Sequence, residues 1–469
     1  MSFFPRRAFA LLFAFAVCCW AESVRPAHLS KWKTQQGWAL RKAPGASRYE
    51  KFFAVGVWNI PGYTKDAMEN APQVYRSGAA AYLQHSPLYN MVYLSPGADD
   101  AAAGRVEVTG SIAFYECLKA CQQAVPSAGG TDADYAVRQQ LRLQAQEGEA
   151  SFLQRLDDAI DRNIRAIGTN DHIWAPVDEI AGGGAGSGWC WSPEVGRRIR
   201  QRIRRREPHT LVYTDLLGIS RGSSYLFERR YLQSHAALPS EPPYDALGEG
   251  ARRLPQRPLL GFVQAYDGSP VYVNGTADYV SYDLPTLKRF FYENLRICAR
   301  DYRACGDVFG INSFIDCNTY PVLAGVAVDG IRSGVGPDVP VWIFFDGNGY
   351  ARPAHQSPEA FAGNLKCQMY ISIIHGATGI LFWNDRSLSP EVFQALEPVL
   401  TELKDREPII KAGTLEQHLE GDVHYMVKRL SDGRTYFVAA NTLTDKEATC
   451  SYNGQVHRLP PYGVAWVQL

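Results

Sequence analysis

The sequence predicts an α/β fold, a (β/α)8 TIM barrel followed by a small C-terminal antiparallel β domain, on three observations. Short apolar segments of strand length alternate with helical segments through most of the chain, which favours a parallel sheet over a sandwich. About eight such units occur, as this barrel requires. From about Ile410 onward, the pattern changes to short alternating strands joined by turns such as Ser431-Asp432-Gly433.

Turn residues bound the expected barrel strands, and residues with high helix propensity dominate the segments between them. The expected strands lie at 51–60, 89–94, 106–114, 172–180, 210–216, 278–283, 308–315, 339–345 and 379–383. The expected helices lie at 64–85, 132–163, from Ser192-Pro193-Glu194 onward, and at 285–303, 359–375 and 390–404. An irregular insertion covers about 218–258, and the expected C-terminal strands are 424–430, 435–441, 448–454 and 462–469.

The N-terminus has the features of a secretory signal. Arg6 and Arg7 precede an apolar run at 8–20, and a small residue, Ala21, follows it. The run is too short to span a bilayer, and no later segment is long and apolar enough to do so. We therefore expect a signal peptide at 1–21, a catalytic barrel at 22–408 and a β-sandwich-like domain at 409–469 in a secreted or periplasmic protein. A lipoprotein signal at Cys18 or Cys19 fits the sequence less well.

The charge balance argues against nucleic acid and anionic membranes as partners. The 48 basic and 48 acidic residues give zero formal net charge, which suits a neutral partner such as a carbohydrate. Oligomeric state has no signature in the sequence.

Eight cysteines remain after the expected signal, and in an oxidising compartment some should form disulfide bonds. Cys117 with Cys121 and Cys298 with Cys305 are close enough in sequence for local bridges. The cysteines show no zinc-ligand spacing, so no structural metal is expected. Asn274-Gly275-Thr276 is a glycosylation sequon.

The segment 172–180 is an apolar strand that ends in two adjacent carboxylates, Asp178 and Glu179. The C-terminal end of a barrel strand faces the active-site mouth, where a carboxylic acid can protonate a glycosidic oxygen. Successive strand residues point to opposite faces, so we expect Glu179 to be the acid and Asp178 to support it. The alternative is a loop-capping Asp178 beside a Glu179 that pairs with a surface arginine.

Glycoside hydrolysis usually needs a second carboxylate, and four aspartates are candidates. Asp346 follows the apolar segment 341–345 and is our first choice, and Asp316 is its rival after the preceding strand. Asp215 and Asp283 also end expected strands. Each has an ordinary alternative, because aspartate is favoured in loops for local hydrogen bonding.

Aromatic and amide residues near expected strand ends are candidates for contact with sugar rings and hydroxyls. For any one of the aromatic residues, core packing is the simpler explanation, and the argument depends on their number. They are Trp58, Asn59, Trp189, Trp191, Tyr320, Trp383 and Asn384.

Seven arginines between Arg197 and Arg206 resemble a nucleic-acid patch. Val195, Ile199 and Ile203 recur among them at helical spacing, so we interpret the segment as the solvated face of an amphipathic barrel helix. His375 is expected to pack or cap a helix end.

Several motifs resemble secreted (β/α)8-barrel glycoside hydrolases with a C-terminal β domain, in the clan that includes β-galactosidases, β-glucanases and cellulases. FFAVGVWNIPGY resembles their first strand, and APVDEI resembles the fourth, which carries the acid/base glutamate. VFGINSFIDCNTYP and VPVWIFF resemble strands six and seven, CQMYISIIHGATGILFWN the last helix and strand, and PPYGVAWVQL the closing strand.

Two positions depart from that clan. Asp178 stands where the clan commonly has asparagine, and Asp346 stands where it has a nucleophilic glutamate. The resemblance therefore implies a cofactor-independent glycoside hydrolase with Glu179 as general acid/base, acting on a poly- or oligosaccharide. The alternative is a catalytically silent barrel that binds glycans. Hydrolysis of another bond would show as a metal or phosphate motif, and we find none.

Overall fold

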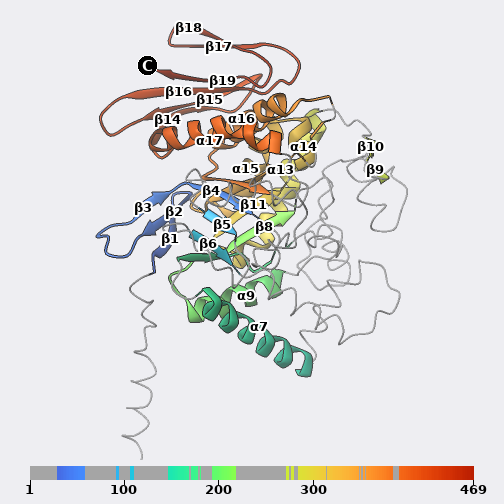
Figure 1. The fold of residues 1–469 in the computed structure, drawn as a ribbon, viewed down its shortest axis with the longest axis vertical. Coiled ribbons are helices and arrows are strands. Elements are labelled where there is room, and N and C mark those ends of the chain that lie inside the picture. The colour runs from blue at the N-terminus through green and yellow to red at the C-terminus, as the bar shows by residue number, and fades with distance from the viewer. Residues whose placement is uncertain are drawn as a thin grey trace, which may run out of the picture.

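The computed structural model describes a core of parallel strands and helices and the C-terminal part of the chain (Figure 1). The described residues are 29–58, 91–93, 106–109, 146–167, 171–177, 180, 193–217, 271–273, 276–278, 284–312, 314–347, 349, 352–353, 355–383 and 390–469. Several features of the sequence analysis lie outside these residues. They are the expected signal peptide, the irregular insertion at 218–258, Cys117 and Cys121, and the first two residues of the sequon, Asn274 and Gly275.

Eight parallel strands form the central sheet, in the order β7-β6-β5-β4-β13-β12-β11-β8. Trp174 on β7 also makes a parallel bridge to Val212, the residue before β8, and its amide donates to the Leu211 carbonyl at 2.8 Å. The two outermost strands of this order are therefore in contact. The strands are β4 (Ala54–Trp58), β5 (Met91–Tyr93), β6 (Val106–Thr109), β7 (His172–Trp174), β8 (Tyr213–Leu217), β11 (Val308–Asn312), β12 (Val341–Asp346) and β13 (Gly379–Trp383).

Only Asp278 of the expected barrel strand at 278–283 is described, and it ends a strand outside the central sheet. Thr276–Asp278 is β10, which pairs antiparallel with β9 (Val271–Val273) outside the central sheet. Asn274-Gly275, which separates the two strands, is a typical two-residue hairpin sequence. The sequence had been interpreted there only as a glycosylation site.

Helices cover the outer face of the sheet. The described ones are α7 (Gln146–Ile167), α9 (Pro193–Arg206), α13 (Leu284–Asp301), α14 (Phe314–Thr319), α15 (Val322–Val335), α16 (Pro358–Ile374) and α17 (Pro390–Ile410). At the start of α16 the Ser357 hydroxyl accepts a hydrogen bond from the Ala360 amide at 3.2 Å, with Pro358 in the first turn. The expected helices at 285–303, 359–375 and 390–404 are confirmed.

The helix α15 was not expected, because its three glycines disfavour helix. Two of them, Gly330 and Gly334, are explained by close packing against α13, and the third, Gly325, faces His375 after α16. A Cβ atom at Gly330 would lie 2.7 Å from the Tyr292 carbonyl oxygen, and one at Gly334 only 2.4 Å from that of Arg296. Gly330 and Gly334 therefore let the two helix backbones approach each other.

Alternation along β12 divides the core into two parts. Val341, Ile343 and Phe345 pack on the helix side, whereas Trp342 and Phe344 belong to the inner cluster. The inner cluster also contains Tyr213, whose ring stacks on Trp342 at a centroid distance of 5.7 Å. The sheet is thus buried on both faces, which explains its continuous apolar strands.

A three-stranded antiparallel sheet, not expected from the sequence, covers the N-terminal ends of the parallel strands. It comprises β1 (Lys31–Gln35), β2 (Trp38–Lys42) and β3 (Glu50–Phe52). The Trp32 amide donates to the His209 carbonyl at 2.8 Å, and the Gly37 carbonyl accepts from the Thr378 hydroxyl at 3.0 Å. Gln36 and Gly37 both have positive φ, 52° and 73°, which makes their two-residue turn suited to a hairpin.

The C-terminal region is antiparallel, and all four expected segments contain strands. One sheet has the order β14-β15-β16-β19, and a separate hairpin joins β17 to β18. Two lysines from other elements bind backbone carbonyls just after α17. Lys428 on β15 donates to the Ala412 carbonyl, and Lys51 on β3 donates to the Lys411 carbonyl. The strands are β14 (Gly413–His418), β15 (Val423–Arg429), β16 (Thr435–Asn441), β17 (Ala448–Tyr452), β18 (Gln455–Leu459) and β19 (Val464–Gln468).

The local disulfide that the spacing of Cys298 and Cys305 allows does not form. Both residues are buried thiols, as are Cys317 and Cys367, and Cys450 is a half-buried one. The Cys305 sulfur contacts the carbonyl oxygen of Pro193 at 3.2 Å, and this contact directs it toward α9. In the described part of the chain, we find no helix long and apolar enough to cross a membrane.

His375 caps the C-terminal end of α16, as expected, and also connects α15 with the β domain. Its Nδ1 lies 2.7 Å from a carboxylate oxygen of Asp329, and its Nε2 lies 2.8 Å from Nδ1 of His424 on β15. Burial, with His375, Lys288 and His418 nearby, lowers the pKa of His424 to about 3. His424 is therefore neutral in the folded protein at ordinary pH.

This buried histidine predicts loss of stability in mild acid. The unfolded chain takes up a proton at His424 near pH 6.5 and the folded chain only near pH 3, so the free energy of unfolding should fall by roughly 1 kcal/mol per pH unit between these values. Urea unfolding of the parent and His424→Gln at pH 7, 6 and 5 measures this. An equally steep decline in the variant would contradict the assignment.

Candidate functional site

Backbone register places three predicted site residues in one row at the C-terminal ends of adjacent strands. Asp346 on β12 pairs with Trp383 on β13, and Trp383 pairs with Trp58 on β4. The sequence analysis placed each at a strand end, and the register now makes them neighbours. In parallel α/β folds, ligands bind at this end of the strands.

Asp346 is a fully buried carboxylate, with 0% of its surface exposed. Its position continues the alternation of Trp342 and Phe344, so its side chain belongs to the inner face of the sheet. The side-chain amide of Asn318 donates to its Oδ2 at 3.2 Å. A buried carboxylate needs such donors, because its charge is costly to remove from water.

Asp215 is a second buried carboxylate, but it does not end its strand as expected. It is the third residue of β8, paired with Gly310 on β11, and it shares the inner face with Tyr213. Its backbone carbonyl accepts a hydrogen bond from the Ile180 amide at 2.9 Å. This bond ties the residue that follows Glu179 in the sequence to β8.

The segment after β11 differs from the expectation. The strand ends at Asn312 and α14 begins at Phe314, so Asp316 lies in a short helix and not at a strand end. Tyr320 follows this helix, half-buried against the helix-side core. The prediction for this segment extended the strand because Phe314 and Ile315 are apolar; both belong instead to α14.

Several predicted site residues lie outside the described residues. They are Asp178, Glu179, Asn59, Trp189, Trp191, Asp283 and Asn384. For these residues the predicted roles stay predictions.

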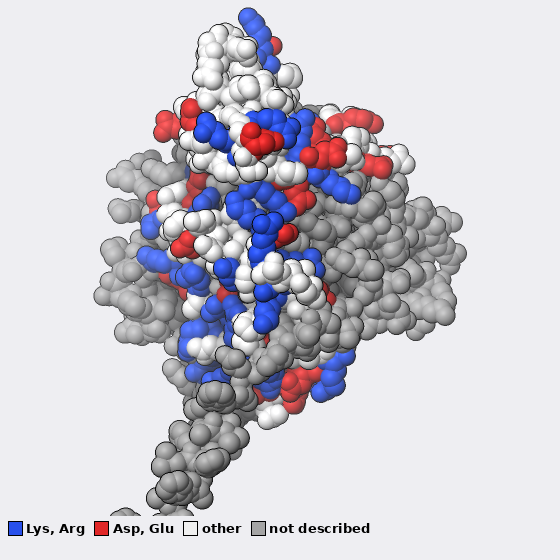
Figure 2. Space-filling view, turned by 90° about the vertical axis from the view of Figure 1, so that its left-hand side faces the viewer, with Lys and Arg blue, Asp and Glu red and all other residues white. Residues whose placement is uncertain are grey.

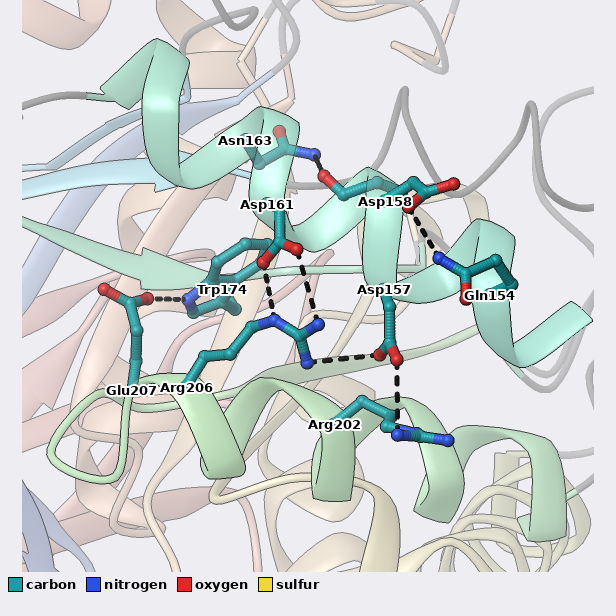
Figure 3. A network of polar contacts seen from close by, with 10 residues as sticks. Gln154, Asp157, Asp158, Asp161, Asn163, Trp174, Arg202, Arg206 and Glu207 are labelled. Carbon is teal, nitrogen blue, oxygen red and sulfur yellow. Dashed lines mark hydrogen bonds and ion pairs between the residues drawn. The ribbon is translucent and has the colours of Figure 1, made fainter. Parts of the chain in front are cut away.

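The expected strand 172–180 is wrong beyond Trp174: β7 ends there, and residues 175–177 are outside it, because Pro176 has no amide hydrogen to donate to a neighbouring strand. A buried glutamate anchors this short strand. Glu207, immediately after α9, accepts a hydrogen bond from the Trp174 indole at 2.6 Å (Figure 3). Nε2 of His172 lies 2.8 Å from the same oxygen. His172 and Trp174 are the first and last residues of β7 and point to its helix side. Glu207 therefore fixes both ends of this short strand.

The arginine-rich helix α9 is amphipathic, as expected, with Ile199 and Ile203 buried. Its arginines, however, are not simply solvated. Arg206 pairs with Asp157 and Asp161 on α7 (Figure 3), and Arg202 also pairs with Asp157. Basic and acidic side chains lie among one another on the face that Figure 2 shows.

Two further arginines of α9 hold a carboxylate at the N-terminal end of β11. Arg200 and Arg204 contact Asp307 at 2.7 and 2.8 Å, and Asp307 also accepts from the Val212 amide. Burial acts to raise the pKa of Asp307, but Arg204 and Arg200 outweigh it and hold this pKa below its usual value. The pairing lies at the end of the strands opposite Asp346 and is structural.

Asn318, Asn364 and Gln368 belong to the site and were not predicted. Gln368 donates to the Asn318 side chain at 3.0 Å, and Asn364 donates to the Asn318 backbone carbonyl at 2.7 Å. Asn364 and Gln368 are four residues apart in α16, among mostly apolar buried residues. Buried amides at that spacing were an available signal. Among the described residues, no group of three or more His, Cys, Asp or Glu side chains could hold a metal ion.

Comparison with known proteins gives structural matches only. No family model matches the chain, and no curated protein matches it. A family 39 glycoside hydrolase from Bacteroides cellulosilyticus has 10% identity and a TM-score of 0.40, over 93% of this chain and 88% of that one. A xylanase 10B from Thermotoga maritima has 8% identity and a TM-score of 0.38, over 76% and 96%.

A β-1,4-mannanase from the sea hare Aplysia kurodai has 12% identity and a TM-score of 0.36, over 80% of this chain and 97% of that one. These structures are glycoside hydrolases. They are proteins of the kind that the sequence motifs resemble, and the similarity assigns no specific family.

The anchoring of β7 predicts a stability defect. Glu207→Leu removes the carboxylate that the buried side chains of Trp174 and His172 contact. Because buried polar groups are costly when they lose an acceptor, we expect the free energy of unfolding to fall by about 2–4 kcal/mol. Urea denaturation measures this. Glu447→Leu, at an exposed ion pair with Arg458, is the matched control and should change stability by less than about 1 kcal/mol. Equal effects in the two variants would contradict the anchoring role.

Proposed function

We propose that this protein is an exported glycoside hydrolase with its active site at the C-terminal mouth of a closed (β/α)8 barrel. The strand order and the bridge between Trp174 and Val212 support closure. The apolar run after Arg6 and Arg7 supports export. The substrate is a poly- or oligosaccharide, and the reaction needs no cofactor.

The single observation that carries this proposal is the row formed by Asp346, Trp383 and Trp58. It combines a buried carboxylate with two aromatic residues at the end of the strands where barrel enzymes bind substrate. Tryptophan stacks on apolar sugar faces, and a carboxylate can act as nucleophile or base. Tyr320 and the amides Asn59 and Asn384 are further candidates for substrate contact.

In the proposed mechanism, Glu179 protonates the glycosidic oxygen as the bond to the anomeric carbon breaks. Asp346 then either attacks that carbon, giving a covalent intermediate that water hydrolyses, or removes a proton from the attacking water. A separation of about 5–5.5 Å between the two carboxyl groups would define the first course, and about 6.5–9.5 Å the second. The hydrogen bond from the Ile180 amide to the Asp215 carbonyl supports this assignment, because Ile180 directly follows Glu179 and the bond ties it to strand β8.

Removing the acid should abolish most of the activity without unfolding the protein. We expect Glu179→Gln to lower kcat/KM for hydrolysis by about 10²–10⁴-fold, because the leaving oxygen loses its proton donor. A reducing-sugar assay over a panel of polysaccharides measures this, and thermal unfolding monitors the fold. Asp178→Asn is the neighbouring control, for which we expect a smaller loss. Near-normal hydrolysis by Glu179→Gln would refute the role of Glu179.

Glycan binding without hydrolysis is the second candidate function. It is favoured by the replacement of the expected strand-seven glutamate by Asp346, whose shorter side chain is completely buried. If this is the function, the parent protein binds soluble glycans in calorimetry yet releases no reducing ends, and Trp383→Ala weakens binding while Asp346→Asn does not. Any release of reducing ends that is lost in Asp346→Asn contradicts it.

A further inference from the structure

A chain of buried side-chain amides leads from Asp346 to the β domain. Asn318 on α14 contacts Asp346, Gln368 and Asn364 on α16 contact Asn318, and Gln356 before α16 contacts Asn364. All four amide residues are buried, between 0% and 7% exposed. A cluster of this kind is stable only when its donors and acceptors satisfy one another.

The direction of the hydrogen bonds in this cluster is fixed. The Asn364 nitrogen must face the Asn318 backbone carbonyl, which only accepts, so Oδ1 of Asn364 faces Gln368 and accepts from its amide nitrogen at 2.9 Å. That nitrogen also donates to Oδ1 of Asn318 at 3.0 Å. The Nδ2 of Asn318 therefore faces Asp346 and donates to it at 3.2 Å. Gln368 thus determines that the nitrogen of the Asn318 side-chain amide, and not its oxygen, faces Asp346.

The helix that carries Asn318 is too short to orient it alone. The helix α14 has six residues, and isolated helices of that length are unstable. The Asn364 side chain binds the Asn318 backbone carbonyl at 2.7 Å, so α16 holds both the main chain and the side chain of this residue. The long helix α16 therefore supplies the rigidity that α14 lacks.

The chain of amides ends on a tyrosine of the β domain. Gln356 accepts from Asn364 at 3.4 Å and donates to the Tyr462 hydroxyl at 3.0 Å. Tyr462 lies in the turn before β19 with a φ of 57°, a backbone conformation that favours glycine. Backbone hydrogen bonds hold this turn. The Tyr462 amide donates to the Leu443 carbonyl, and the Gly463 amide donates to the Pro460 carbonyl.

We propose that Asn318 is a positioning residue for Asp346, and that the amide chain through Gln368, Asn364 and Gln356 makes Tyr462 of the β domain part of the active-site scaffold. This inference rests on the proposed function of Asp346. Asn318 orients the carboxylate plane and stabilises its charged form by a hydrogen bond. The β domain then contributes to the reaction without touching the substrate.

Kinetics of three variants test the proposal. Asn318→Ala should lower kcat about tenfold or more, leave KM within about twofold, and move the acidic limb of the pH–rate profile to higher pH. Gln368→Met keeps Asn318 and the helix volume but removes the orienting donor, so it should move the profile in the same direction. Tyr462→Phe, at the far end of the chain, should act more weakly. Unchanged kcat and pH profile in both Asn318→Ala and Gln368→Met would overturn the inference.

Ser372→Ala is the matched control. Its hydroxyl donates to the Gln368 backbone carbonyl within α16, so this variant removes a buried hydrogen bond of the same helix that does not reach Asp346. We expect parent kinetics from it. A loss equal to that of Asn318→Ala would assign the effect to general damage to α16.

A readout that does not need activity separates this inference from the proposed function. The carboxyl ¹³C resonance of Asp346, assigned by its loss in Asp346→Asn, is followed against pH in the parent and in Asn318→Ala. A transition at higher pH in the variant supports the positioning role even if no polysaccharide is cleaved, which would refute only the proposed hydrolysis. Identical transitions in the two proteins refute the positioning role whether or not the parent is active.

Discussion

Parallel backbone pairing around the central sheet is the constraint on which the rest of the structure depends. Each strand aligns with its neighbours, and the contact of Trp174 with Val212 joins the two outermost strands. Because all strands run the same way, residues far apart in sequence meet at one end. Asp346, Trp383 and Trp58 become neighbours only through this pairing, since no local sequence connects them.

Burial of the sheet on both faces creates a second constraint: polar side chains inside the protein need hydrogen-bond partners there. Three carboxylates of the described core lie beside a partner: Glu207 beside the indole of Trp174, Asp307 beside two arginines, and Asp346 beside Asn318. Helices supply the partners of Asp307 and Asp346, and Glu207, which directly follows a helix, is itself the partner of Trp174 on β7. The outer helices therefore do more than cover apolar surface, because they also decide how the carboxylates are held.

Continuous apolar segments made most strands and the long helices predictable from the sequence. The sheet β1–β3 was missed because its strands mix charged and apolar residues and its Gln-Gly turn is an unusual hairpin signal. The helix α15 was missed because glycine disfavours helix unless a neighbour comes close. For the site, the sequence indicated strand ends but not register, so it proposed Asp346 and could not give its neighbours or Asn318 as its donor.

The N-terminal sheet has a consequence for how the chain is made. Its residues are synthesised before several of their partners, since Gln36 bonds to Asp338, Gly37 to Thr378 and Lys51 to Lys411, each more than 300 residues later. This sheet therefore lacks these partners until nearly all of the parallel sheet has been synthesised. Such long separations slow folding, because loop closure must precede the contacts that reward it. These three strands are thus translated before the parallel sheet that they bind, and reach their final place only after it has formed.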